Sequence, residues 1–373
     1  MVNKFIFQIL LFISLFSFNA SGQTLLKYID KGSYSVGFTT YSEIDLTRPS
    51  IVNNNKFGRE LQVNVWYPSK KKMNEAKTMS YNDYISLKTT EIPELKITDD
   101  ISIDDYFSWP KSNGGNQREI AKFINANHKM WAVKDSNKAS SNFPLILMMH
   151  GSVADHAFLG EYLASYGYVV VLVPTNGYLQ KDFDVNDKGM ESQIRDYEYA
   201  QTQVAGKFNL ETNKIAVIGF SFGAQSALGL ALRNPQVSTI ISLDGGIGSR
   251  FGSKLIADNP FYELDKINKP ILHIYNPEDS YTYLTNIKGY AYSDRTLIGL
   301  KNIDHWNFTS FGILNNHIPN LFGENKYSKT AGEASIWLIL DFLNSQFNMN
   351  IREEKNKDWV EKSIIKKELF KKL

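Results

Sequence analysis

The sequence contains no cysteine among its 373 residues. Disulfide bonds, cysteine nucleophiles, thiolate metal sites and a lipid-modified cysteine are therefore excluded, and stability must come from burial of a core. An excess of one charge sign is also lacking. The formal net charge is only +2, which gives no reason to expect nucleic acid as a partner. The hydrophobic content of 43%, with 23 Phe and 20 Tyr, excludes general disorder.

Long apolar runs are scarce outside the N-terminus. Residues 5–18 are almost all apolar, follow a single positive charge at Lys4, and precede the small residues Ala20-Ser21-Gly22. This is the pattern of a secretory signal peptide, and the run is shorter than the ~20 residues of a spanning helix. An uncleaved membrane anchor is the alternative. We predict a signal peptide over residues 1–22, export to the periplasm or the medium, and no integral membrane span in the mature chain.

Short apolar runs recur after residue 143 and have the character of strands buried on both faces of a sheet. Segments with helical spacing lie between and after them. The apolar runs are 144–149, 168–173, 214–218, 237–243 and 270–275, and the helical segments are 157–166, 190–208, 224–233 and 333–347. The alternation predicts an α/β fold with a mostly parallel sheet and helices on both faces. We expect one domain over residues 23–350.

Two segments differ from this pattern. Residues 60–67 alternate apolar and polar side chains, which predicts a strand with one covered face. Residues 70–142 are polar and irregular, with Trp109 and Trp131 among scattered aromatics. We interpret them as an insertion or cap that folds over the main body.

The C-terminal segment, residues 351–373, carries eight Lys or Arg and five Asp or Glu. Its apolar residues recur at helical spacing: Val360, Ile364, Ile365, Leu369 and Leu373. A basic amphipathic helix docked on the domain, or frayed from it, is the favoured interpretation, and weak contact with a membrane surface is the alternative.

The pentapeptide Gly219-Phe-Ser-Phe-Gly223 places a serine between two glycines, after a predicted strand and before a predicted helix. A tight turn of this kind lifts a nucleophilic serine out of the sheet, and it requires residues with almost no side chain two positions before and after the serine. We therefore predict Ser221 as a nucleophile. The alternative is a glycine-rich turn in which the serine is incidental.

A serine needs a base and donors for the oxyanion. The loop after the first buried strand, Met149-His-Gly-Ser152, and the residue after the nucleophile supply such donors, which predicts the backbone amides of Ser152 and Phe222. His150 precedes the nucleophile and is better interpreted as a packed, hydrogen-bonded histidine.

The base follows the serine in chain order in this fold. His273 lies inside a buried run and His317 lacks a flanking pattern, whereas His305 opens a loop after an apolar segment. We predict His305. Asp244 and Asp279 each end a strand and could orient the imidazole. Asp244 is favoured because two glycines follow it, and Asp279 remains the alternative acid.

Together, Gly219–Gly223, Leu-Asp244-Gly-Gly and His305-Trp-Asn-Phe308 resemble the platelet-activating-factor acetylhydrolases and the related dienelactone-hydrolase-like enzymes of the α/β-hydrolase superfamily. Val65-Trp-Tyr-Pro-Ser69 and His150-Gly151 are similar to that family's early strand and oxyanion strand. The resemblance covers roughly residues 60–347. It implies Ser221 as nucleophile, Asp244 as acid, His305 as base and the amides of Ser152 and Phe222 as the oxyanion hole, but it names no substrate.

These observations predict an exported serine hydrolase that cleaves a small-molecule carboxylic ester through an acyl-enzyme. Amide cleavage or acyl transfer by the same triad, or a catalytically silent binding module, are the alternatives. Trp306, Phe220 and Phe222 are candidates for an apolar acyl pocket. No glycine-rich phosphate loop and no zinc-type HExxH motif occurs, and Asp182–Asp187 lacks the glycine and glutamate of a calcium loop, so we expect no cofactor and no metal.

Overall fold

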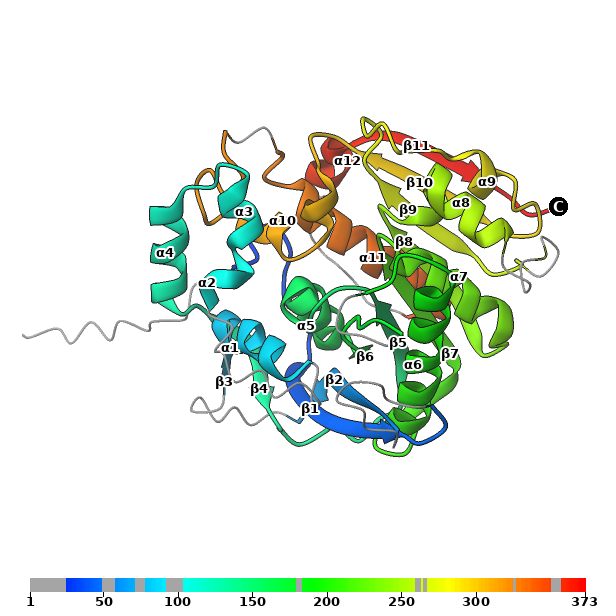
Figure 1. Ribbon diagram of the computed structural model, residues 1–373, viewed down its shortest axis with the longest axis horizontal. Helices are drawn as coiled ribbons and strands as arrows, with labels where there is room; N and C mark the ends of the chain where they lie inside the picture. Colours follow the sequence, from blue (N-terminus) through cyan, green and yellow to red (C-terminus); the bar gives the residue numbers. More distant parts are fainter. Residues whose placement is uncertain are drawn as a thin grey trace, which may run out of the picture.

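The computed structural model describes residues 25–48, 58–70, 78–91, 103–178, 183–258, 263, 267–324, 327–349 and 357–373. The signal peptide predicted over residues 1–22 lies outside these residues. In the described part, eleven strands form one sheet with the order β11-β10-β9-β8-β7-β5-β6-β2-β1-β4-β3 (Figure 1).

The strands are β1 (Ser35–Asp45), β2 (Arg59–Ser69), β3 (Thr78–Ser80), β4 (Lys129–Lys134), β5 (Phe143–Met149), β6 (Val169–Leu172), β7 (Leu210–Phe220), β8 (Val237–Leu243), β9 (Ile271–Tyr275), β10 (Arg295–Leu300) and β11 (Ile364–Phe370). The α-helices are α1 (Tyr81–Ser86), α2 (Ile103–Tyr106), α3 (Ser108–Ser112), α4 (Gln117–Ala126), α5 (Ala157–Ser165), α6 (Asp187–Ala205), α7 (Gly223–Arg233), α8 (Arg250–Ala257), α9 (Thr285–Lys288), α10 (Phe311–Leu314), α11 (Ala331–Phe347) and α12 (Asp358–Ser363). Short 3₁₀ helices are η3 (Leu87–Thr90), η4 (Ala154–His156), η5 (Gly246–Gly248) and η7 (His305–Phe308).

The centre of the sheet is parallel. The adjacent strands in the series β6, β5, β7, β8, β9 and β10 pair with one another in parallel, whereas β2 joins β6, and β1 joins β2, in antiparallel orientation. The helices that connect the parallel strands lie over both faces of the sheet (Figure 1). The fold is therefore the mostly parallel α/β architecture predicted from the alternating runs.

The apolar strands separate the core into two layers, because successive side chains of a strand point to opposite faces. In β5, Ile146 and Met148 belong to the layer packed against α5 and α11, whereas Leu145 and Leu147 belong to the layer packed against α6, α7 and α8. A strand covered on both faces has no position left for a solvated side chain, which explains the continuous apolar runs in the sequence.

The expectation that residues 60–67 have one covered face is wrong. β2 lies inside the sheet between β1 and β6, and its residues from Leu61 onward are all buried. Its two polar side chains satisfy each other and the neighbouring strand: Gln62 Nε2 donates to Asn64 Oδ1 (3.1 Å), and Asn64 Nδ2 donates to the carbonyl of Leu172 (3.2 Å). Hydrogen bonds offset the cost of burying polar groups. The alternation of apolar and polar residues in this strand therefore does not mean that its polar side chains are exposed to solvent.

Residues 70–142 supply α1 to α4 and also two strands. β4 pairs in parallel with β1, and β3 pairs with β4 at the edge of the sheet. The helices group at one end of the molecule (Figure 1) and contact the main body through aromatic rings, such as Tyr81 stacked on Phe158 with centroids 5.3 Å apart. The segment is thus partly continuous with the central sheet, which an irregular polar sequence did not indicate.

The helix predicted for the C-terminal segment is wrong beyond Ser363. Among the described residues of this segment, 357–373, α12 alone is helical, and residues 364–370 form β11, which pairs antiparallel with β10 at the sheet edge (Figure 1). An edge strand offers unpaired backbone groups to any chain that can add a strand, and the β-branched pair Ile364-Ile365 suits that conformation. The tail is therefore part of the sheet.

Within the described residues, none of the helices combines the length and apolar character required to cross a membrane.

Deletion of residues 357–373 should lower thermal stability, because it uncovers the backbone of β10 and removes Val360, which is only 2% exposed. We expect a melting temperature lower by at least about 3 °C and concentration-dependent association, measured by calorimetry and light scattering. Deletion of residues 371–373, which lie beyond β11, is the control and should change neither. Equal stability of the two shortened chains would show that β11 does not protect the edge.

Candidate active site

Ser221 occupies a tight turn between β7 and α7, and the backbone there leaves no room for larger neighbours. Its φ of +51° lies in the left-handed region, which non-glycine residues rarely adopt. A Cβ on Gly219 would lie 2.4 Å from the Cα of Ala224, and one on Gly223 would lie 2.4 Å from the carbonyl oxygen of Met149. Both glycines are thus required for the helix and the end of β5 to approach the serine.

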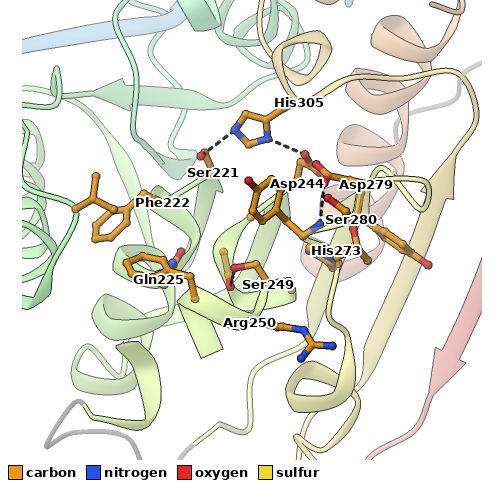
Figure 2. A pocket seen from close by; sticks show the side chains of 18 residues that line it. Ser221, Phe222, Gln225, Asp244, Ser249, Arg250, His273, Asp279, Ser280 and His305 are labelled. Atoms are coloured by element: carbon orange, nitrogen blue, oxygen red, sulfur yellow. Dashed lines mark hydrogen bonds and ion pairs between the residues drawn. The ribbon is translucent and has the colours of Figure 1, made fainter. Parts of the chain in front are cut away.

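His305 and Asp244 lie beside this serine, although the three residues are far apart in the chain (Figure 2). His305 Nε2 is 2.9 Å from Ser221 Oγ, and His305 Nδ1 is 2.7 Å from Asp244 Oδ2. The arrangement fits a neutral imidazole that donates from Nδ1 to the carboxylate and accepts the serine proton at Nε2.

Asp244 and His305 are each held by further contacts. Asp244 is 8% exposed, and its second oxygen, Oδ1, accepts a hydrogen bond from the backbone of Asn276 (2.9 Å). His305 begins η7, which is capped by the side chain of Asp304, and its ring lies 4.7 Å from that of Phe220. Asp304 therefore caps the loop and leaves the Nδ1 side of the imidazole to Asp244.

The other candidates lie elsewhere. Asp279 Oδ1 accepts a hydrogen bond from the backbone of Tyr281 (2.8 Å) in the turn after β9, so the structure brings Asp244, and not Asp279, to the imidazole. His273 is buried with Nδ1 2.9 Å from Ser242 Oγ, and His317 Nε2 is 2.6 Å from the carbonyl of Leu25.

His150 is packed, as expected, against the rings of Phe183 and Phe222. Its Nδ1 is buried without a hydrogen-bond partner among the described residues, so the expected hydrogen bond is wrong for that nitrogen. Desolvation by burial lowers the pKa of His150 to about 4, which keeps its imidazole neutral.

The two backbone amides predicted for an oxyanion hole differ in their hydrogen bonding. Phe222 follows Ser221 directly, and its N–H donates to no acceptor in the part of the chain that the structure describes. The N–H of Ser152 donates to Asp155 Oδ2 (2.7 Å). Sequence reasoning missed Asp155, although the pattern Ser152-Val-Ala-Asp155 before an apolar helix is the signature of a capping box.

A pocket of about 470 Å³ opens beside Ser221 and extends past Asp244 toward α8 and the turn after β9 (Figure 2). Phe222, Phe251, Tyr275 and Tyr281 provide its aromatic surface, and the buried side chains of Gln225 and His273 provide polar groups. Phe251 and Tyr281 are 55% and 77% exposed, so large apolar rings face solvent around the catalytic candidates. Pockets of this size and mixed lining commonly hold small organic ligands.

Only one of the three aromatics predicted for the pocket contributes to its lining. Phe222 lies in it, whereas Phe220 packs under the His305 ring and Trp306 packs against Trp109 with centroids 5.1 Å apart. Helix α8, the end of β9 and the turn after β9 supply the remaining aromatic surface, and only the folded chain brings them to Ser221. Within the described residues, no group of three or more His, Asp or Glu side chains is arranged to hold a metal ion.

Comparison with known proteins agrees with this architecture. A family described as Chlorophyllase matches residues 123–257, which include Ser152, Ser221 and Asp244. The solved structure of a ferulic acid esterase from Streptomyces cinnamoneus superposes with a TM-score of 0.63, over 93% of this chain and 100% of that chain, at 18% identity. The chain has the α/β-hydrolase fold. The predicted fold class is thus confirmed.

Sequence similarity to cutinases covers a shorter segment. Cutinase 2 of Thermobifida cellulosilytica is 31% identical over 93 residues, which make up 25% of this chain and 35% of that protein. A cutinase of Thermobifida fusca is also 31% identical over 93 residues, which make up 28% of its length. The chain thus spans about a third of these relatives. The acetylhydrolase subtype stays a prediction.

The Gly223→Ala substitution should destabilise the protein, because the new methyl group would contact backbone atoms of β5 that cannot move independently of the sheet. We expect a loss of about 1–3 kcal/mol in the free energy of unfolding, measured by urea denaturation. Gly206→Ala is the matched control, since a Cβ there meets only the carbonyl of Gln203, at 3.6 Å. A Gly223→Ala protein as stable as the control would contradict the close approach described here.

Proposed function

We propose that this α/β-hydrolase is an exported serine hydrolase that cleaves carboxylic esters through Ser221, His305 and Asp244. The observation that carries the proposal is the pair of contacts at the two nitrogens of His305, 2.9 Å to the hydroxyl and 2.7 Å to the carboxylate. The similarity to cutinases and to a ferulic acid esterase favours an ester as the bond cleaved.

In the first half of the reaction, Ser221 Oγ attacks the ester carbonyl while His305 Nε2 removes its proton. The imidazolium that forms is stabilised by the carboxylate of Asp244, and the carbonyl oxygen becomes an oxyanion beside the free N–H of Phe222. When the tetrahedral intermediate collapses, the C–O bond to the alcohol breaks and His305 gives its proton to the departing oxygen. An acyl group remains on Ser221.

In the second half, water takes the place of the alcohol. His305 removes a proton from the water as its oxygen attacks the acyl carbon, and the proton then passes to Ser221 Oγ as the acyl–serine bond breaks. The carboxylic acid leaves and the resting hydrogen bonds form again. Each step uses the same imidazole, so the orientation fixed by Asp244 acts twice in a turnover.

The pocket beside Ser221 supports a substrate with an apolar, preferably aromatic, group of moderate size. Phe222, Phe251 and Tyr281 would contact such a group, and the buried Gln225 and His273 would contact its polar substituents. The resemblance to acetylhydrolases supports the type of reaction, and it does not identify the substrate.

Export is supported by the sequence of residues 1–22, whose apolar run and small residues suit a cleaved leader. The lack of cysteine is compatible with either the periplasm or the medium.

Ser221→Ala should abolish both hydrolysis of a nitrophenyl ester and labelling by a fluorophosphonate probe. Asp244→Asn should reduce kcat by about 10⁴-fold, since the imidazole loses the acceptor that fixes its orientation. Asp279→Asn is the matched control and should change kcat by no more than about twofold, because its carboxylate bonds the backbone of Tyr281 instead. Labelling that persists without Ser221, or activity lost only in Asp279→Asn, would overturn the assignment.

A panel of nitrophenyl esters with acyl groups of increasing length, together with an aromatic acyl ester and the matching anilide, tests the bond and the pocket. We expect the anilide to be cleaved at least about 100-fold more slowly than its ester, because nitrogen is the poorer leaving group and needs fuller protonation by His305. Aromatic or medium acyl groups should give the highest kcat/KM, since they fill the pocket. An enzyme that prefers the anilide would be an amidase and not an esterase.

A further inference from the structure

The backbone amide of Ser152 is engaged in a capping box at the start of η4 and α5. Its N–H donates to Asp155 Oδ2 (2.7 Å), the Ser152 hydroxyl donates to the same oxygen (2.8 Å), and the N–H of Asp155 lies 3.3 Å from Ser152 Oγ. This reciprocal pairing satisfies donors that the first turn of a helix leaves free. The same N–H is one of the two donors expected to bind the oxyanion, so it has two competing acceptors.

The carboxylate of Asp155 is held from the opposite side by the segment that contains α2. The hydroxyl of Tyr106 donates to Asp155 Oδ1 (3.0 Å), and the Tyr106 ring stacks on Phe311 with centroids 5.0 Å apart. Tyr106 in turn contacts the hydroxyl of Tyr81 at 3.1 Å. Asp155 is therefore fixed by two elements, and its position does not depend on the Ser152 loop alone.

Asp155 also lies close to the backbone that precedes the Ser152 amide. A Cβ built on Gly151 would lie 3.2 Å from Asp155 Oδ2, and Gly151 adopts a φ of +107° that favours glycine. The carboxylate thus lies against the backbone that leads to the Ser152 amide. An oxyanion bound by that amide would share its N–H with a carboxylate oxygen 2.7 Å from the nitrogen, and two negative charges around one donor repel each other.

No cation compensates this charge within the described residues, and the ionisable groups that face it are neutral or acidic. His150 and His156 both have pKa values lowered by burial, and the phenols of Tyr81 and Tyr106 have pKa values raised by burial. Glu91 is buried nearby and accepts a hydrogen bond from the N–H of Val153 (3.3 Å). Burial, and then the charge of Asp155, raises the pKa of Glu91 to about 7.

We infer that Asp155 is a latch on the oxyanion hole: it occupies the Ser152 amide in the free protein, and the transition state must displace it. The inference rests on the proposed function, because only an enzyme that forms an oxyanion at Ser221 has such competition. Asp155 is a positioning residue that acts through Ser152, and its carboxylate lowers the rate while it stabilises the start of η4. Catalysis by the latched protein relies on the open amide of Phe222.

The test is Asp155→Asn, which keeps the shape and a neutral acceptor for the Ser152 N–H but removes the charge. We expect kcat for a nitrophenyl ester to rise about tenfold with KM nearly unchanged, because the competing charge acts on the oxyanion and not on the bound ester. A trifluoromethyl ketone, which forms an anionic adduct with a catalytic serine, should bind tighter by the same factor. A purely structural role of Asp155 would not improve either quantity.

The matched control is Asp83→Asn, which removes the charge from a second capping box, formed with Ser80 at the start of α1. It should leave kcat and inhibitor affinity within about twofold. If Asp155→Asn does not fold, Asp155→Ser removes the same charge and should raise kcat and the ketone affinity together. Unchanged or lower values in the folded variant would overturn the latch. Wild-type protein that fails to turn over esters would instead refute the proposed function.

Discussion

The close approach of two backbones at Ser221 is the constraint on which the site depends. Gly223 lies against the carbonyl of Met149, which brings the turn after β7 next to the end of β5. The serine can then project between the loops that follow the neighbouring strands, and Asp244 and His305 reach it from β8 and β10. A side chain at either glycine would separate these strand ends, so the hydrogen bonds of the imidazole follow from the packing of the turn.

The parallel arrangement of the central strands converts this local packing into a site. Parallel strands all end at the same edge of a sheet, and ligands in open α/β sheets bind outside these carboxyl ends. Ser152, Ser221, Asp244, Asp279 and His305 each follow such a strand. The edge therefore gathers several polar side chains, and their hydrogen bonds decide which of them act together: Asn276 fixes Asp244, whereas Tyr281 occupies Asp279.

Ser152 illustrates a conflict between a local rule and a function. The capping box with Asp155 stabilises the start of a helix, and it uses the same N–H that we propose as a donor to the oxyanion. Natural sequences follow local structural preferences, such as helix capping, almost everywhere, and the exceptions are expected at functional sites. The hydrogen bond from Tyr106 to Asp155 connects the segment of residues 70–142 to this pair of residues, although that segment supplies none of the described residues that line the pocket.

The sequence by itself determined the α/β class, the turn around Ser221 and the choice of His305, because these depend on periodicity, on glycines with no tolerable substitute and on chain order. It left Asp244 and Asp279 unresolved, since both end strands and only long-range packing selects between them. Tertiary structure decided three further features: the burial of β2, the formation of strand β11, and the aromatic lining of the pocket at Phe251 and Tyr281. Each of these features depends on which elements lie next to each other in the folded chain, and a local sequence pattern does not contain that information.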